Sequence, residues 1–170
     1  MALENTLAKV VERIMTTKLA DAAEEHNLLP WNQMGGRRRR STLSALDLLT
    51  SCIQTAWSSR KGCIVLMLSL DISGAYDHVS TERLLWILQR KGLLEWIIKY
   101  VKNFMQGRRT RVAFDGYKSE WVQINSGIPQ GSPISPILFL FFISELLEGM
   151  QSVEEKQLGV RFMDDINIIT

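Results

Sequence analysis

The stretch that decides the fold is residues 162–170 at the end of the chain, which reads FMDDINIIT. Apolar residues alternate with polar ones on both sides of the pair Asp164-Asp165, and this pattern predicts two short strands joined as a hairpin. Two carboxylates at the tip of such a hairpin repel each other and lose hydration, which is costly. A divalent cation relieves that cost, and hard oxygen ligands favour magnesium or manganese. A solvated Asp-Asp turn is the alternative for this stretch taken alone.

A third aspartate follows a predicted strand near the middle of the chain. Residues 63–70 form a nearly unbroken apolar run, which predicts a strand buried on both faces, and Asp71 comes directly after it. Gly74 and Ala75 keep the next turn small, so its backbone N–H groups could approach phosphate oxygens. An ordinary turn aspartate is the alternative for Asp71. If the strands that precede Asp71 and follow Asp165 pair, three carboxylates converge and could hold two divalent ions.

The loop at residues 127–136, which reads GIPQGSPISP, contains two glycines and three prolines. It precedes a predicted helix at about residues 136–150, and helix N-termini suit anions. A capping loop without further function is the alternative. This loop is therefore a candidate for contact with a phosphorylated substrate.

Apolar residues at helical spacing, together with caps and glycine stops, predict four more helices. They are expected at about residues 5–25, from 42 to a break at Gly62, from 81 to a stop at Gly92, and at about residues 93–105. The second of these carries an apolar stripe on one side. A hairpin is expected from strands at 109–114 and 119–124 around the turn 115–118. This order of elements predicts an α+β domain in which helices back a small sheet.

Composition excludes two broad classes of protein. The chain has 170 residues, of which 46% are hydrophobic and 22% charged, and its net charge is +2, so a disordered protein is excluded. The longest apolar run, residues 137–143, is too short to span a bilayer, and no membrane association is expected. Cys52 and Cys63 lie among apolar residues, which favours reduced thiols and an intracellular location. Arginines cluster at residues 37–40 and 108–111.

Taken in chain order, the three stretches resemble motifs A, B and C of reverse transcriptases. The matches are Asp-x-x-x-Ala-Tyr at 71–76, Gly-Ile-Pro-Gln-Gly-Ser-Pro at 127–133 and Phe-Met-Asp-Asp at 162–165. Residues 33–42, QMGGRRRRST, are similar to a stretch of non-LTR (LINE-like) retrotransposon polymerases, in which an aromatic residue occupies the position of Gly36. The resemblance covers the chain from the late fingers to motif C.

The resemblance implies an α+β polymerase palm, a small antiparallel sheet backed by helices, with part of the helical fingers and without the thumb. It implies one partial reverse transcriptase domain, with fingers-side helices in about residues 1–60 and the palm in about residues 61–170. A fingers hairpin and thumb segments are expected to come from the full-length parent. A retrotransposon enzyme is also expected to be nuclear.

The resemblance also implies residue roles. The catalytic, metal-binding residues would be Asp71, Asp164 and Asp165, holding two Mg²⁺ ions or Mn²⁺ as a substitute. Tyr76 would exclude a 2′-hydroxyl, Gln130 would contact the incoming nucleotide and Gly131 would let the template–nucleotide pair approach. The main chain of Ile72, Ser73, Gly74 and Ala75 would lie along the triphosphate. Template phosphates would be contacted by Arg37, Arg38, Arg39 and Arg40, for which a solvated run is the alternative.

A chain with these roles would be an RNA-directed DNA polymerase, a nucleotidyltransferase. It would bind an RNA template and a DNA primer, and would add deoxynucleotides to the primer 3′-hydroxyl by two-metal phosphoryl transfer. The expected lack of a primer grip and a thumb leaves an alternative open. In that alternative the chain is a truncated, catalytically inactive retroelement remnant with at most weak nucleic-acid binding.

Overall fold

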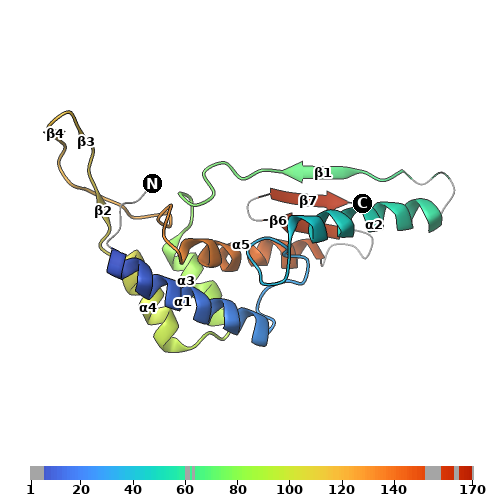
Figure 1. Ribbon diagram of the computed structural model, residues 1–170, viewed down its shortest axis with the longest axis horizontal. Helices are drawn as coiled ribbons and strands as arrows, with labels where there is room; N and C mark the ends of the chain where they lie inside the picture. Colours follow the sequence, from blue (N-terminus) through green and yellow to red (C-terminus); the bar gives the residue numbers. More distant parts are fainter. Residues whose placement is uncertain (1–5, 60–61, 63, 152–157, 163–164, 170) are drawn as a thin grey trace.

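The computed structural model describes residues 6–59, 62, 64–151, 158–162 and 165–169 (Figure 1). Five helices and seven strands follow in the order α1 (Thr6–Glu25), α2 (Thr42–Ser59), β1 (Met67–Leu70), α3 (Thr81–Arg90), α4 (Glu95–Met105), β2 (Arg109–Thr110), β3 (Ala113–Phe114), β4 (Tyr117–Lys118), β5 (Val122–Gln123), α5 (Ser135–Gln151), β6 (Leu158–Phe162) and β7 (Asp165–Ile169). The predicted α+β class is confirmed, because helices pack beside small antiparallel sheets.

The principal sheet has three strands in the order β1-β7-β6, all antiparallel to their neighbours. β6 and β7 form the predicted terminal hairpin, with Phe162 opposite Asp165. A further stretch of backbone lies along the free side of β6, where Gln33 forms a parallel bridge with Arg161. The sheet therefore joins three parts of the sequence that lie far apart: residues 32–34, residues 67–70 and the C-terminal hairpin.

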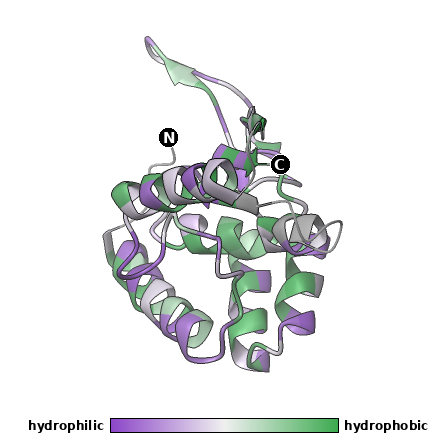
Figure 2. Cartoon of the chain, turned by 90° about the vertical axis from the view of Figure 1, so that its right-hand side faces the viewer, coloured by the Kyte–Doolittle hydropathy of each residue, from purple (hydrophilic) through white to green (hydrophobic). Residues whose placement is uncertain are grey.

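The hydrophobic core lies mainly between α5 and the helices α1, α3 and α4. Its centre on α5 is made of fully buried residues such as Leu138, Leu140 and Phe141, and Leu19 of α1 and Leu84 and Leu88 of α3 belong to the same cluster. Figure 2 shows green, hydrophobic segments on these helices facing inward, toward one another. Ser80 is the N-cap of α3, and its side-chain oxygen accepts a hydrogen bond from the Arg83 backbone N–H.

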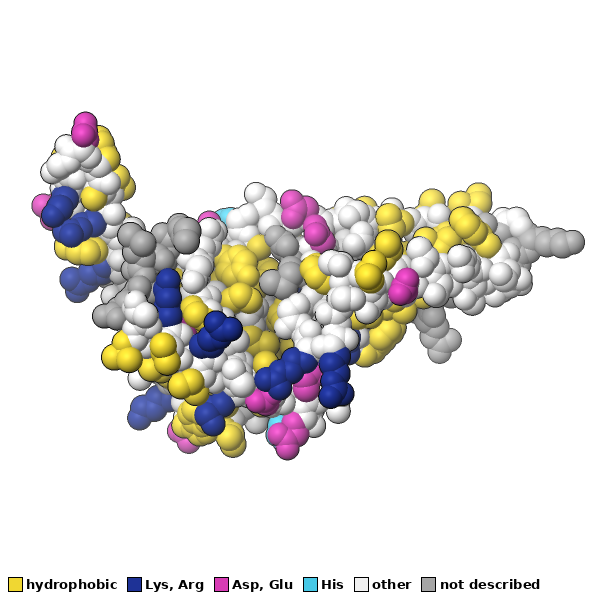
Figure 3. All heavy atoms as spheres, in the orientation of Figure 1, with side chains coloured by type: hydrophobic (Ala, Val, Ile, Leu, Met, Phe, Trp, Pro, Cys, Tyr) yellow, Lys and Arg dark blue, Asp and Glu magenta, His cyan; other side chains and the backbone are white. Residues whose placement is uncertain are grey.

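One expectation about burial is wrong. Of the strand predicted at 63–70, the structure shows Met67–Leu70, and every residue of β1 is exposed; Cys63 lies outside the described residues. β1 is at the edge of the sheet and pairs on one side only, whereas α5 packs against β6 at the other edge. The apolar side of α2 is partly exposed and partly half-buried, and Ala45 is the one buried residue of this helix, because α2 lies at the periphery beside β6. Figure 3 shows these apolar side chains gathered over the end of the molecule formed by α2 and β1.

The predicted hairpin between α4 and α5 is confirmed, and it projects away from the body of the molecule (Figure 1). Its turn has two residues instead of the four expected, since Phe114 pairs directly with Tyr117. Asp115 and Gly116 both have positive φ, 49° and 81°, which is the conformation of a tight primed turn. Within the part of the chain that the structure describes, no helix has the length and apolar character needed to cross a membrane.

Candidate functional site

Strand pairing brings the backbone positions of two of the three predicted catalytic residues to the same end of the sheet. β1 and β7 are antiparallel, with Leu70 opposite Ile166. Because Asp71 follows Leu70 and Asp165 precedes Ile166, the same register brings these two aspartates opposite each other at one end of the sheet. Both are exposed. Asp164 lies outside the described residues, so its geometry stays a prediction.

The turn after Asp71 is fastened to the loop at residues 127–133. The backbone N–H of Ile128 donates to the carbonyl oxygen of Tyr76 at 2.8 Å, and that of Gly127 donates to Val79 at 2.8 Å. The turn itself is closed by a 2.9 Å bond from the Asp77 N–H to Gly74, whose φ is +62°. Motif A is thus paired with motif C through its strand and with motif B through its turn.

The motif B loop is also anchored by hydrogen bonds to α1. Glu12 is a buried residue of α1, and its carboxylate accepts a hydrogen bond from the hydroxyl of Ser132. One turn further along, the hydroxyl of Thr16 donates to the carbonyl oxygen of Pro133 at 3.0 Å. Gln130 and Gly131 lie just before this anchored segment and remain exposed. The loop therefore combines a fixed base with two residues accessible to a ligand.

Tyr76 packs against α5 through its ring. The rings of Tyr76 and Phe139 are stacked, with centroids 5.1 Å apart and an interplanar angle of 21°. Phe139 is buried, whereas Tyr76 is only half-buried. One face of the Tyr76 ring is thereby fixed at the junction of motifs A and B.

The four consecutive arginines do not share one environment. The guanidinium of Arg37 binds both carboxylate oxygens of Glu24, at 2.6 and 2.8 Å, and only 4% of the Arg37 side chain is exposed. The hydrogen bond from Arg37 is the main cause that holds the pKa of the Glu24 carboxyl below its usual value. Arg40 donates to the backbone carbonyls of Trp31 and Gln33. Both side chains thus stabilise the loop that precedes α2.

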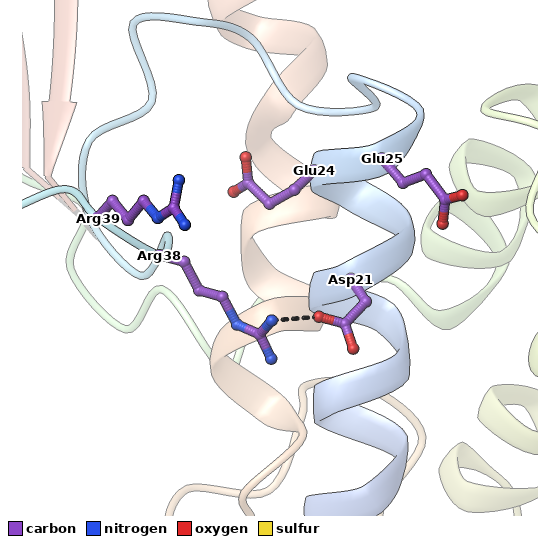
Figure 4. Close-up of a pocket in the computed structure, with 5 residues that line it drawn as sticks. All are labelled: Asp21, Glu24, Glu25, Arg38 and Arg39. Atoms are coloured by element: carbon purple, nitrogen blue, oxygen red, sulfur yellow. Dashed lines mark ion pairs between the residues drawn. The ribbon is translucent and has the colours of Figure 1, made fainter.

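Arg38 and Arg39 are exposed and line a surface pocket with the acidic residues of the α1 C-terminus, Asp21, Glu24 and Glu25 (Figure 4). The dashed line in Figure 4 marks the ion pair between Arg38 and Asp21. Both partners of this pair are about half exposed, and exposed pairs contribute little stability, about 0–1 kcal/mol. Arg38 could therefore exchange this carboxylate for a phosphate at small cost.

Sequence reasoning missed three buried residues that shape the site: Glu12, Phe139 and Arg161. Glu12 and Phe139 occur inside ordinary helical patterns, and nothing in their spacing distinguishes them from neighbouring residues. Arg161 carried a detectable signal, because it directly precedes the predicted terminal hairpin between the apolar residues Val160 and Phe162, and a buried arginine requires partners.

Antiparallel strands that bring carboxylates to one end of a small sheet, backed by helices, define a polymerase-like α+β fold. The whole chain, residues 1–170, matches the family described as "Reverse transcriptase (RNA-dependent DNA polymerase)". The chain belongs to this family. The resemblance to reverse transcriptases drawn from the three motifs is thus confirmed.

The relatives come from non-LTR retrotransposons. The chain is 27% identical over 169 residues to the probable RNA-directed DNA polymerase from transposon X-element of Drosophila melanogaster, covering 98% of this chain and 18% of that protein. It is 30% identical over 178 residues to the Pol polyprotein of a type-1 retrotransposable element R2 of Popillia japonica, covering 99% of this chain and 24% of that protein. The chain therefore spans about a fifth of the length of these relatives.

Among solved structures, apo telomerase from Candida tropicalis has the same fold. The match has a TM-score of 0.66 at 17% identity and covers 98% of this chain and 34% of that structure. Telomerase from Candida albicans in complex with a fragment of telomeric RNA matches with a TM-score of 0.64 at 14% identity, covering 96% of this chain and 30% of that structure. These matches confirm the fold.

The contact between motifs A and B gives a prediction about Gly127. Its φ is +76°, and a Cβ placed there would lie 2.9 Å from the Asp77 Cα and 3.0 Å from the Tyr76 carbonyl oxygen. We expect Gly127→Ala to lower the free energy of unfolding, measured by urea denaturation, because backbone atoms of the adjoining turn would have to move. Gly107→Ala is the control, since Gly107 has φ +66° and open space around it. The control carries only the left-handed backbone cost, about 1–2 kcal/mol, and equal losses for both variants would contradict the prediction.

Proposed function

We propose that this chain forms the nucleotidyl-transfer core of an RNA-directed DNA polymerase from a retrotransposon. The reaction would join a deoxynucleotide to the 3′-hydroxyl of a DNA primer annealed to an RNA template. The observation that carries the proposal is the register of β1 and β7, which brings Asp71 across from Asp165. Membership of the reverse transcriptase family supports it.

The donor set suits a hard divalent cation. Asp71 and Asp165 present exposed carboxylates at adjoining strand ends, and Asp164 would add a third. The described residues contain no cluster of three or more acidic, histidine or cysteine side chains that could hold a metal ion, but Asp164 is outside them. Two Mg²⁺ ions held by the three aspartates, or Mn²⁺ in their place, would activate the primer hydroxyl and neutralise the departing pyrophosphate.

The remaining residues would bind and select the nucleotide. Backbone N–H groups of the tight turn formed by Ile72, Ser73, Gly74 and Ala75 would lie along the triphosphate. The flat ring of Tyr76 would leave room for hydrogen but not for a hydroxyl at the 2′ position of the sugar. Gln130 and Gly131, both exposed at the edge of the motif B loop, would contact the nucleotide and its template base.

We further propose one domain, with fingers-side helices in about residues 1–60 and the palm in about residues 61–170. The core supports a single domain, because Met15, Leu19 and Ala23 of α1 belong to the same hydrophobic cluster as α3, α4 and α5. As a retrotransposon polymerase, the protein would act in the nucleus. The partners would be an RNA template, a DNA primer and deoxynucleoside triphosphates.

Primer extension on an RNA template tests the proposal. The protein, in the longest form that its gene encodes, is given primer, template, four deoxynucleotides and Mg²⁺ or Mn²⁺. We expect Asp71→Asn, Asp164→Asn and Asp165→Asn each to lower incorporation by at least about 100-fold, because each removes a charged metal ligand. Asp77→Asn is the matched control, since Asp77 is an exposed aspartate of the same segment that lies off the β1–β7 register.

Incorporation that survives in Asp71→Asn or Asp165→Asn would remove the proposed catalytic role of these residues. No incorporation by the unmodified protein under any of these conditions would favour the alternative, an inactive retroelement remnant.

The arginine run is proposed to contact template phosphates, mainly through Arg38 and Arg39. Each phosphate contact on single-stranded RNA contributes about 0.7 to the slope of log affinity against log salt. We expect the double variant Arg38→Gln, Arg39→Gln to reduce that slope by roughly 1.4, measured by fluorescence anisotropy with labelled RNA. The control is Arg83→Gln, which removes an exposed arginine of α3 that pairs with Glu145. An unchanged slope in the double variant would mean that Arg38 and Arg39 are solvated and do not contact RNA phosphates.

A further inference from the structure

A buried arginine, Arg161, contacts residues that adjoin the proposed nucleotide site. Arg161 lies in β6, three residues before Asp164, and none of its surface is exposed. Burying a guanidinium costs much of its hydration, and an apolar side chain at this position would avoid that cost. The position of Arg161 between two parts of the site accounts for its presence.

On one side, Arg161 binds the segment that precedes the arginine run. Its backbone N–H donates to the Asn32 carbonyl at 3.2 Å, and its carbonyl oxygen accepts a hydrogen bond from Met34 at 2.8 Å. Its side chain donates to Oε1 of Gln33 at 3.4 Å. Gln33 is itself fully buried, and its amide nitrogen donates to the Gly35 carbonyl at 3.2 Å. The backbone bonds position this residue of β6, and the bond to Gln33 directs its guanidinium.

On the other side, Arg161 contacts the ring that supports Tyr76. The Arg161 Cζ lies 5.1 Å from the centroid of the Phe139 ring, within the range of a cation–π interaction. Phe139 is in turn stacked on Tyr76. The Tyr76 ring is thus linked through Phe139 to a guanidinium that donates to Gln33, on a residue whose backbone is bonded to residues 32–34.

We propose that Arg161 is a positioning residue that fixes the Tyr76 ring through Phe139 and thereby sets the discrimination between deoxyribonucleotides and ribonucleotides. The inference rests on the proposed function, in which Tyr76 meets the sugar of the incoming nucleotide. It adds a residue outside the three motifs to the selectivity of the site, and it gives the segment 32–35 a role in holding that residue.

Nucleotide selectivity provides the first test, in primer extension with the longest form of the protein. Arg161→Met should lower the ratio of kcat/KM for a deoxynucleotide to that for the matching ribonucleotide by about tenfold, a usual size for coupling between contacting residues. Arg161→Lys keeps the charge and should restore part of the ratio. Phe139→Leu should act in the same direction as Arg161→Met and serves as a second variant if that one folds poorly.

Two controls separate positioning from general damage. Phe141→Leu truncates another fully buried phenylalanine of α5, two residues away and so on a different face of the helix, and it should leave the ratio unchanged. In a Tyr76→Val background, Arg161→Met should have no further effect on the ratio, because its action passes through the missing ring. An equal effect in both backgrounds would overturn the inference.

Fluorine NMR of protein labelled with 3-fluorotyrosine tests the positioning itself, without any requirement for activity. The Tyr76 resonance, assigned with Tyr76→Phe, should shift in Arg161→Met and Phe139→Leu and stay in place in Phe141→Leu. An unmoved resonance in Arg161→Met would overturn the inference even in an active polymerase. A shifted resonance together with unaltered selectivity in Tyr76→Val would retain the positioning contact and refute the sugar-contact role assigned under the proposed function.

Discussion

The antiparallel pairing of β1 with β7 is the constraint on which the rest of the site depends. Side chains alternate between the two faces of a strand, so a slip of one residue would turn every side chain of β7 to the other face. The buried residue Ile166 opposes such a slip, because its side chain would turn away from the face on which it is buried. The strand pairing thus places the position of Asp71 across from that of Asp165.

Two further sets of contacts connect the paired strands to the rest of the candidate site. The turn after β1 is bonded to the motif B loop, and that loop is anchored by Glu12 and Thr16 of α1. On the far edge of the sheet, β6 is bonded to residues 32–35 through Arg161. Segments that share no local sequence signal are therefore connected to one sheet, and a substitution in α1 or in residues 32–35 could act on the proposed nucleotide site without contacting a nucleotide.

Most helices and the terminal hairpin could be predicted from the sequence, because their caps, glycine stops and apolar spacing are local signals. Ser80 before α3 and the apolar alternation of residues 165–169 are examples. Burial was harder to predict, since the apolar run of β1 resembles a central strand but lies at a sheet edge. The candidate site shows the same division: the motifs nominate the aspartates and Tyr76, which stay predictions, whereas the contacts of Glu12, Phe139 and Arg161 depend on tertiary packing that sequence spacing does not record. The sequence could not separate the roles of the four arginines, because only the structure shows that Arg37 and Arg40 have partners within the protein.

The central claim is that strand pairing brings Asp71 and Asp165 to one point that can bind divalent cations. Anomalous X-ray scattering from crystals of the protein grown with Mn²⁺ measures this directly. The account predicts an anomalous peak within about 2.5 Å of carboxylate oxygens from both residues, at the end of the sheet where β1 leaves and β7 begins. Carboxylates that point to separate surfaces, with no manganese shared between them, would contradict it.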